Sequence, residues 1–212
     1  MSSMFRSFSE YNYRVWFLGA FVSNIGTWMQ ATALSWVVLT ELTQNDAGAM
    51  GITMGLQFAP PLLLVSVTGW VADRFDRRRL LMITQLLLLL LGTAIGVLLL
   101  VGVMTLPLMY AFALGLGVVG AFDTPARQAF VSDLVSRTYA ANAVALNSAS
   151  FNGARMIGPA IAGLVIVAVG TGWVFLLNGV TFVAMIVALA LLRPESLAPR
   201  VRAPGAARLA DG

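Results

Sequence analysis

The chain alternates long apolar runs with short polar links. An α-helix needs about 20 apolar residues to cross the hydrocarbon core of a bilayer, and each of these runs is near that length. The runs lie at 15–39, 48–72, 80–103, 106–122, 145–169 and 173–192. The pattern therefore predicts an all-α membrane protein, with six transmembrane helices packed as a bundle in contact with the lipid bilayer.

The composition supports this prediction and removes several classes of chemistry. Of 212 residues, 59% are hydrophobic and 10% are charged, which is typical of a polytopic membrane protein. The chain has no histidine and no cysteine, so it lacks imidazole bases, thiols and the usual transition-metal ligands. We expect no enzyme, no metal site and no cofactor. The arginines lie mostly in the links between runs, which does not favour nucleic acid as a partner.

The two ends of the chain differ from the middle. Residues 1–14 predict a polar, mildly basic lead-in, and the run that follows is too long for the apolar core of a signal peptide. Residues 193–212 are rich in proline, alanine and arginine, which is typical of a disordered linker or tail. The transmembrane domain is therefore expected at 15–192.

Arginine falls almost entirely on one side of the predicted topology. All 13 basic residues are arginine, and 12 of them precede the first run, follow the sixth, or lie between the second and third or the fourth and fifth. The links on the other side carry only the acidic residues Glu41 and Asp46. The positive-inside rule then predicts that both termini are cytoplasmic, in an inner or plasma membrane.

Arg155 is the thirteenth arginine and lies inside an apolar run. Only 14 apolar residues follow it before the next link, so the fifth helix must begin before it, near 145–147. Two interpretations stay open: an interfacial arginine that reaches the headgroups, or an arginine paired with an acid inside the bundle. Asp123 is the first candidate partner and Asp73 the second. Asp123 and Arg127 are themselves candidate charges at the membrane interface or within it.

Several runs also contain polar side chains. In the first run these follow one helical stripe, which indicates either packing between helices or the wall of an aqueous cavity. The candidate cavity residues, drawn from three runs, are Asn24, Thr27, Gln30, Gln57, Asn147 and Asn152.

Prolines and small residues predict bends and close packing. The pair Pro60-Pro61 interrupts the second run, and Pro159 interrupts the fifth, where each should bend its helix. Around Pro159 a face of small residues favours the close approach of another helix. The residues of this face are Ala154, Gly158, Ala162 and Gly163.

The link at 69–81 has the highest charge density and a recognisable pattern. It reads GWVADRFDRRRLL, and it matches G-x-x-x-D-R-x-G-R-[RK] except that Asp76 replaces the second glycine. This pattern resembles the signature turn between helices two and three of the major facilitator superfamily. The matching residues are Gly69, Asp73, Arg74, Arg77 and Arg78.

The resemblance covers nearly the whole chain. Further segments are similar to the branch of siderophore and drug exporters of the enterobactin-exporter type, and GPAIAG is similar to an exporter motif of the fifth helix. These segments are 26–43, 58–64, 121–137, 140–152 and 154–164. The resemblance implies the N-terminal six-helix half of the superfamily fold, a three-plus-three inverted repeat.

The resemblance also implies a function and roles for individual residues. It implies a secondary transporter that exports a small amphipathic molecule by alternating access, with the substrate held between two six-helix halves. Asp73 is expected to hold the cytoplasmic side closed through the other half, and Arg77 and Arg78 to tie local helices and headgroups. The run at 106–122 lacks the arginine common in proton-coupled relatives, so proton coupling would depend on Asp73, Asp123 or a second half.

The chain holds only one such half. A complete transporter would need a second six-helix half, either another copy or a separate chain. The alternative is a non-transporting membrane subunit or a truncated remnant with a scaffolding or regulatory role.

Overall fold

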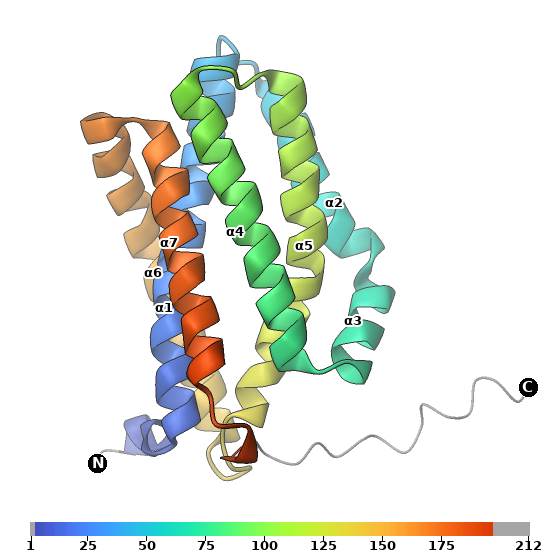
Figure 1. Ribbon diagram of the computed structural model, residues 1–212, viewed down its shortest axis with the longest axis vertical. Helices are drawn as coiled ribbons and strands as arrows, with labels where there is room; N and C mark the ends of the chain where they lie inside the picture. The colour runs from blue at the N-terminus through green and yellow to red at the C-terminus, as the bar shows by residue number, and fades with distance from the viewer. Residues whose placement is uncertain (1–2, 197–212) are drawn as a thin grey trace, which may run out of the picture.

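Helices account for almost all of the chain that the structure describes (Figure 1). The structure is a computed structural model that describes residues 3–196, so most of the predicted tail at 193–212 lies outside the described residues. The elements are η1 (Ser3–Ser9), α1 (Tyr11–Trp36), η2 (Val37–Leu42), α2 (Ala47–Leu63), α3 (Val65–Arg74), α4 (Arg77–Val101), α5 (Leu106–Asp133), α6 (Ala140–Val169), α7 (Thr171–Leu191) and η3 (Pro194–Ser196).

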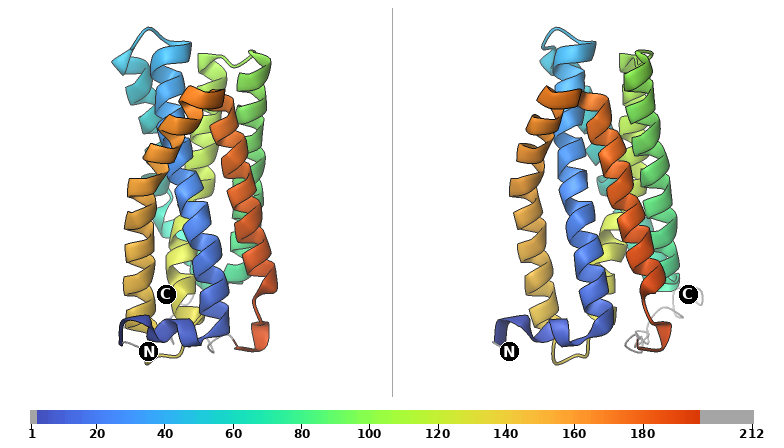
Figure 2. Two further views of the ribbon diagram at one scale, coloured as in Figure 1. Left: turned by 90° about the vertical axis from the view of Figure 1, so that its left-hand side faces the viewer. Right: turned by 60° about the vertical axis from the view of Figure 1, so that its left-hand side comes forward.

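Among the described residues, five of the six predicted crossings meet the length and hydropathy expected of a membrane span. Helices α4, α5, α6 and α7 are each long and apolar enough to span a membrane, and α2 and α3 together meet the same criterion as one span bent by 56°. Helix α1 has 26 residues but falls short in hydropathy, because its polar stripe offsets its apolar side chains. It lies between α6 and α7 along the bundle (Figure 2). The predicted all-α bundle is confirmed.

The bend in the second span comes from its proline pair. Pro60 and Pro61 lie in the last turn of α2, and the helix ends at Leu63, immediately before the break at Leu64. Proline has no N–H, so the carbonyls of Leu56 and Gln57 lose their helical partners. Pro159 has a milder effect, since α6 runs through it without interruption.

The apolar runs predict a link at 123–144, between the fourth and fifth runs, and these boundaries are wrong. Helix α5 continues to Asp133 and α6 begins at Ala140, so only a short turn separates them. The polar residues that suggested a link are accommodated within α5 because Asp123 and Arg127 pair with each other.

The helix contacts repeat a single arrangement twice. Helix α1 packs against α6 and α7, and α5 packs against α2 and α4 in the same way. Helices α4 and α7 pack against each other and join the two groups. If α1, the α2–α3 span and α4 are exchanged with α5, α6 and α7 in that order, these helix contacts are reproduced. This symmetry is expected for a three-plus-three repeat.

One end of the bundle gathers the arginines. The start of α1, the α3–α4 turn, the α5–α6 turn and the end of α7 all lie there (Figure 1). We call it the arginine end, and its basic residues are Arg6, Arg14, Arg74, Arg77, Arg78, Arg79, Arg137 and Arg193. An apolar cluster that includes Trp16, Phe130 and Leu189 fills the bundle just inside it.

Hydrogen bonds fasten the start of the chain at this end. The short helix η1 lies across the ends of α1 and α6 (Figure 2), and the Ser7 hydroxyl donates to Asn142 Oδ1 at 2.7 Å. The Asn12 side chain donates from Nδ2 to the carbonyl of Arg193 at 2.9 Å and accepts from the N–H of Arg193 at 2.9 Å. The first turn of α1 is thereby joined to the residue where α7 has just ended.

Candidate functional site

Asp76 gives the α3–α4 turn a defined helix start. It is the N-cap of α4, and its carboxylate accepts a hydrogen bond from the N–H of Arg79 at 2.8 Å. Aspartate is among the best N-cap residues and also interacts favourably with the positive end of the helix dipole. The residue that departs from the signature pattern therefore has a local structural function.

Arg77 joins three helices at this turn. Its Nη1 donates to both carboxylate oxygens of Asp133 at the end of α5, each at 3.1 Å. Its Nε donates to the carbonyl of Ala72 in α3 at 3.1 Å, and its Nη2 donates to Asp73 Oδ1 at 3.3 Å. Asp133 was not predicted as a site residue, because the sequence pattern suggested a link here and not the end of a transmembrane helix.

The two acids that contact Arg77 differ in burial. The side chain of Asp133 is 15% exposed, whereas that of Asp73 is 80% exposed. An exposed ion pair contributes little to stability, while a buried partner fixes the geometry. Asp133 thus holds Arg77 in place, and Asp73 remains available on the surface.

Arg78 and Arg74 make separate contacts. Arg78 donates from Nε to the carbonyl of Leu189 at 2.8 Å and from Nη2 to the carbonyl of Ala190 at 3.0 Å. These bonds satisfy carbonyls in the last turn of α7, where a cation is favoured. The guanidinium of Arg74 lies 5.2 Å from the ring centre of Trp70 in its own helix. Arg78 thus joins the start of α4 to the end of α7.

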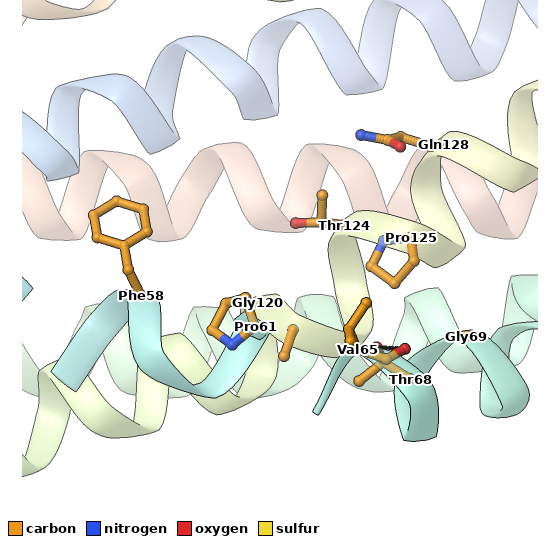
Figure 3. A pocket seen from close by; sticks show the side chains of 10 residues that line it. Phe58, Pro61, Val65, Thr68, Gly69, Gly120, Thr124, Pro125 and Gln128 are labelled. Carbon is orange, nitrogen blue, oxygen red and sulfur yellow. Dashed lines mark hydrogen bonds between the residues drawn. The ribbon is translucent and has the colours of Figure 1, made fainter. Parts of the chain in front are cut away.

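An open groove lies beside the turn (Figure 3). It has a volume of about 460 Å³ and runs between the bent α2–α3 span and α5. Gly69 lies at its edge, and a side chain added there would meet no atom within 4 Å. The groove is lined by Phe58, Pro61, Val65, Thr68, Gly69, Gly120, Ala121, Thr124, Pro125 and Gln128.

Asp123 is the centre of a buried polar network between α4 and α5. Its Oδ1 accepts from the Thr84 hydroxyl and from Gln85 Nε2, each at 2.7 Å, and its Oδ2 accepts from Arg127 Nε at 3.0 Å. The side chains of Asp123 and Arg127 are 9% and 14% exposed. Both Asp123 oxygens are engaged in this network, so the predicted pairing of Asp123 with Arg155 is wrong. Asp73 likewise pairs with Arg77.

Arg155 lies at the middle of α6 and contacts an aromatic ring. Its guanidinium carbon is 5.2 Å from the ring centre of Trp28 in α1. Trp28 in turn packs edge-on against Phe151, with ring centres 5.7 Å apart. Arg155 is exposed, and within residues 3–196 no carboxylate forms an ion pair with it.

The polar stripe of α1 divides into two parts. Gln30 is buried, and its Oε1 accepts from Asn178 Nδ2 in α7 at 2.8 Å, while Asn178 Oδ1 accepts from the Thr181 hydroxyl at 2.7 Å. This arrangement makes Gln30 a packing residue, which is one of the two interpretations of the stripe. Thr27 is exposed and donates to the carbonyl of Ser23 within its own helix.

The remaining cavity candidates do not form one cluster. Asn24 is 8% exposed in α1, Gln57 is half-buried in α2, and Asn147 is half-buried in α6. Asn152 is exposed one turn before Arg155 and donates to the carbonyl of Ser148 at 2.9 Å. Of this set, Thr27 and Asn152 present polar side chains at the surface of the half.

The α1–α6 contact uses most of the predicted small-residue face. Ala154 and Ala162 are fully buried, and a Cβ at Gly158 would lie 2.9 Å from the carbonyl oxygen of Ile25 and 3.1 Å from the N atom of Met29. Gly163 is exposed and has no neighbour within 4 Å of an added Cβ, so it lies outside this face.

The Gln30–Asn178 bond supplies a test of the packing interpretation. Replacing Asn178 with alanine leaves Gln30 Oε1 buried without its donor, and we expect a modest loss of stability of about 0.6–1.7 kcal/mol. Thermal unfolding in detergent would measure it, with Asn152→Ala as the exposed control on α6. An equal shift for both variants would contradict the buried packing role of Asn178.

Comparisons with known proteins agree with the fold. Residues 2–206 match the family model described as transmembrane secretion effector. The staphyloferrin A transporter of Staphylococcus aureus is 33% identical over 84% of this chain and 45% of its own length. The MFS-type transporter YfiS of Bacillus subtilis, which is described as uncharacterized, is 25% identical over 86% of this chain and 42% of its own length.

The chain therefore spans less than half the length of these curated relatives. The family match covers almost all of it, and the packing follows the repeat expected of one six-helix half. The chain therefore belongs to the transmembrane secretion effector family of the major facilitator superfamily.

Proposed function

We propose that this chain is the N-terminal half of an exporter of small amphipathic molecules, such as siderophores or drugs. The observation that carries the proposal is the Arg77 junction, which fixes the signature turn to α3 and α5 while leaving Asp73 80% exposed. The similarity to a staphyloferrin A transporter supports a siderophore or a molecule of comparable size as substrate.

The geometry of the turn suits a gate that opens by release of a surface contact. Asp73 lies in the last turn of α3, near the groove edge at Gly69. A second six-helix half that met this surface would contact an exposed carboxylate on a rigid support. Separation of the halves would then break that contact without disturbing the buried Arg77–Asp133 pair.

The distribution of arginine supports an orientation. Arginines gather at the arginine end, whereas the described opposite loops carry acidic residues and no arginine. We propose that the arginine end faces the cytoplasm of a plasma or inner membrane, with both termini on that side. The proposed gate would then close the cytoplasmic entrance.

Replacing Asp73 with asparagine should reduce efflux strongly while leaving membrane insertion unchanged. The side chain is exposed, so its removal costs the fold little, but it removes the charge proposed to hold the gate closed. The measurement is efflux of a fluorescent amphipathic substrate from cells that express this chain with a matching second half. Efflux is compared at equal membrane abundance.

Asp76→Asn is the matched control in the same turn. It makes the same change of charge, and asparagine caps a helix about as well as aspartate, so α4 should keep its start. Unchanged efflux in Asp73→Asn, or an equal loss in Asp76→Asn, would contradict the gating role of Asp73.

The alternative function is that of a non-transporting membrane subunit with a scaffolding or regulatory role. The same assay separates the two functions. Efflux that requires both this chain and a second half supports the transporter, whereas efflux by the second half without this chain supports a scaffolding or regulatory role.

A further inference from the structure

We propose that Arg155, with Trp28 and Asn152, recognises an anionic group on the transported molecule. The inference rests on the proposed function and adds a substrate class to it. The group is a carboxylate or another oxyanion, bound on the side of the α1–α6 pair that carries the polar residues of α6.

Depth in the membrane is the first argument. Helix α6 has 30 residues, and at 1.5 Å per residue Arg155 is about 22 Å from its first residue and about 21 Å from its last. The guanidinium is directed onto Trp28 of the neighbouring helix and not along α6 toward an interface. A charge at this depth is unfavourable in lipid, so Arg155 must face protein or water.

The residues along α6 show which side of the helix is polar and which side is apolar. Ser148, Asn152 and Arg155 follow one another at spacings of four and three residues and share a polar stripe. The side of α6 opposite Arg155 carries Ile157 and Leu164, which are 42% and 73% exposed and suit contact with lipid. Arg155 therefore lies on the polar side of α6, while the apolar side of the same helix is suited to face lipid.

Unused hydrogen-bond donors are the second argument. The guanidinium of Arg155 has five N–H groups, and none of them donates to any acceptor within residues 3–196. The Nε1–H of Trp28, on the ring beneath it, is buried and also lacks an acceptor in that part of the chain. The free donors of the exposed Arg155 guanidinium favour a ligand rich in acceptor oxygens, because arginine binds such groups with paired hydrogen bonds.

The supporting contacts make the site rigid. The close approach at Gly158 holds α1 and α6 together one turn from Arg155, and Phe151 packs against the edge of Trp28. The guanidinium therefore rests on a fixed aromatic surface with its donor edges free. A phospholipid phosphate lies at the bilayer surface and not at this depth, which favours a solute that enters the bundle.

Cysteine accessibility tests the proposal without knowledge of the substrate. The chain has no cysteine, so Asn152→Cys introduces a single thiol one turn from Arg155. In membrane vesicles, its rates of reaction are measured with the anionic sulfonatoethyl and the cationic trimethylammonium-ethyl methanethiosulfonates. Ile157→Cys, on the opposite apolar side of α6, is the matched control, and Ser148→Cys replaces Asn152→Cys if that variant is not inserted.

We expect the thiol at position 152 to react faster with the anionic reagent. Arg155→Gln should lower the ratio of anionic to cationic rates by about tenfold or more, while Arg155→Lys should keep it. The thiol at position 157 should react slowly with both reagents. These results would support an anion site that is open to water.

Two outcomes would overturn the proposal. No reaction at positions 148 and 152 would mean that lipid or protein covers the stripe, and a ratio unchanged by Arg155→Gln would mean that a neighbouring carboxylate already neutralises the charge. Labelling does not require transport. A clear anionic preference without efflux would therefore reject the proposed function alone, and Asp73-dependent efflux without that preference would reject this inference alone.

Discussion

Replacing Asp123 with alanine is expected to cost about 3–5 kcal/mol of stability, the largest effect of any substitution considered. The carboxylate accepts three hydrogen bonds from Thr84, Gln85 and Arg127, and its removal leaves the Arg127 charge buried without a partner. An uncompensated charge inside a helix bundle is costly because neither water nor lipid headgroups reach it. The expected result is a large fall in membrane abundance and in the unfolding temperature in detergent.

A double variant separates the charge from the packing. Asp123→Asn with Arg127→Gln removes both charges and keeps similar side-chain volumes, so it should be clearly more stable than Asp123→Asn alone. Asp46→Asn, at an exposed N-cap of α2, is the surface control and should leave stability nearly unchanged. Stability of Asp123→Ala within about 1 kcal/mol of the original chain would show that the network is not a structural element.

Replacing Gly158 with leucine is expected to disrupt the α1–α6 pair. A Cβ at this position already falls within 2.9 Å of the Ile25 carbonyl oxygen and 3.1 Å of the Met29 N atom. Backbone atoms cannot rotate away as a side chain can, so the two helices must separate. Overpacking of this kind costs about 1–3 kcal/mol and sometimes more.

Gly163 provides the matched control on the same helix. It is exposed, and a Cβ there meets nothing within 4 Å, so Gly163→Leu should leave the unfolding temperature almost unchanged. Thermal unfolding in detergent compares the two leucine variants directly. Equal destabilisation would mean that glycine at these positions matters through helix conformation and not through the close approach of α1.

The fold was largely predictable because the bilayer imposes a simple rule. Every crossing needs a long apolar run, so the helices could be placed from hydrophobicity alone. The rule fails where polar residues lie inside a helix. Asp123 and Arg127 suggested a link, yet α5 continues past them because each satisfies the other. Because this part of the chain was predicted as a link, Asp133 was not predicted as a partner of Arg77. Its proximity to Arg77 depends on how α5 packs.

The candidate site was predictable only in part. The signature pattern located the turn from sequence, but the difference between a buried Asp133 and an exposed Asp73 follows from packing. For Gln30, sequence left two interpretations open, and its partner Asn178 is 148 residues away along the chain. For Arg155, the two expected environments were the headgroups at the membrane interface and a partner acid inside the bundle. The aromatic ring of Trp28 is a third environment that spacing within one helix does not reveal.

The double hydrogen bond between Asn12 and the backbone of Arg193 has a mechanical consequence. Arg193 also lies over the ring of Tyr11 at 4.3 Å, so the polypeptide leaves the bundle from a point that is held on α1. Each further residue extends the reach of the chain by at most about 3.6 Å from that anchor. A force applied to the chain after Arg193 would therefore act on the first turn of α1 before it could separate α7 from the bundle.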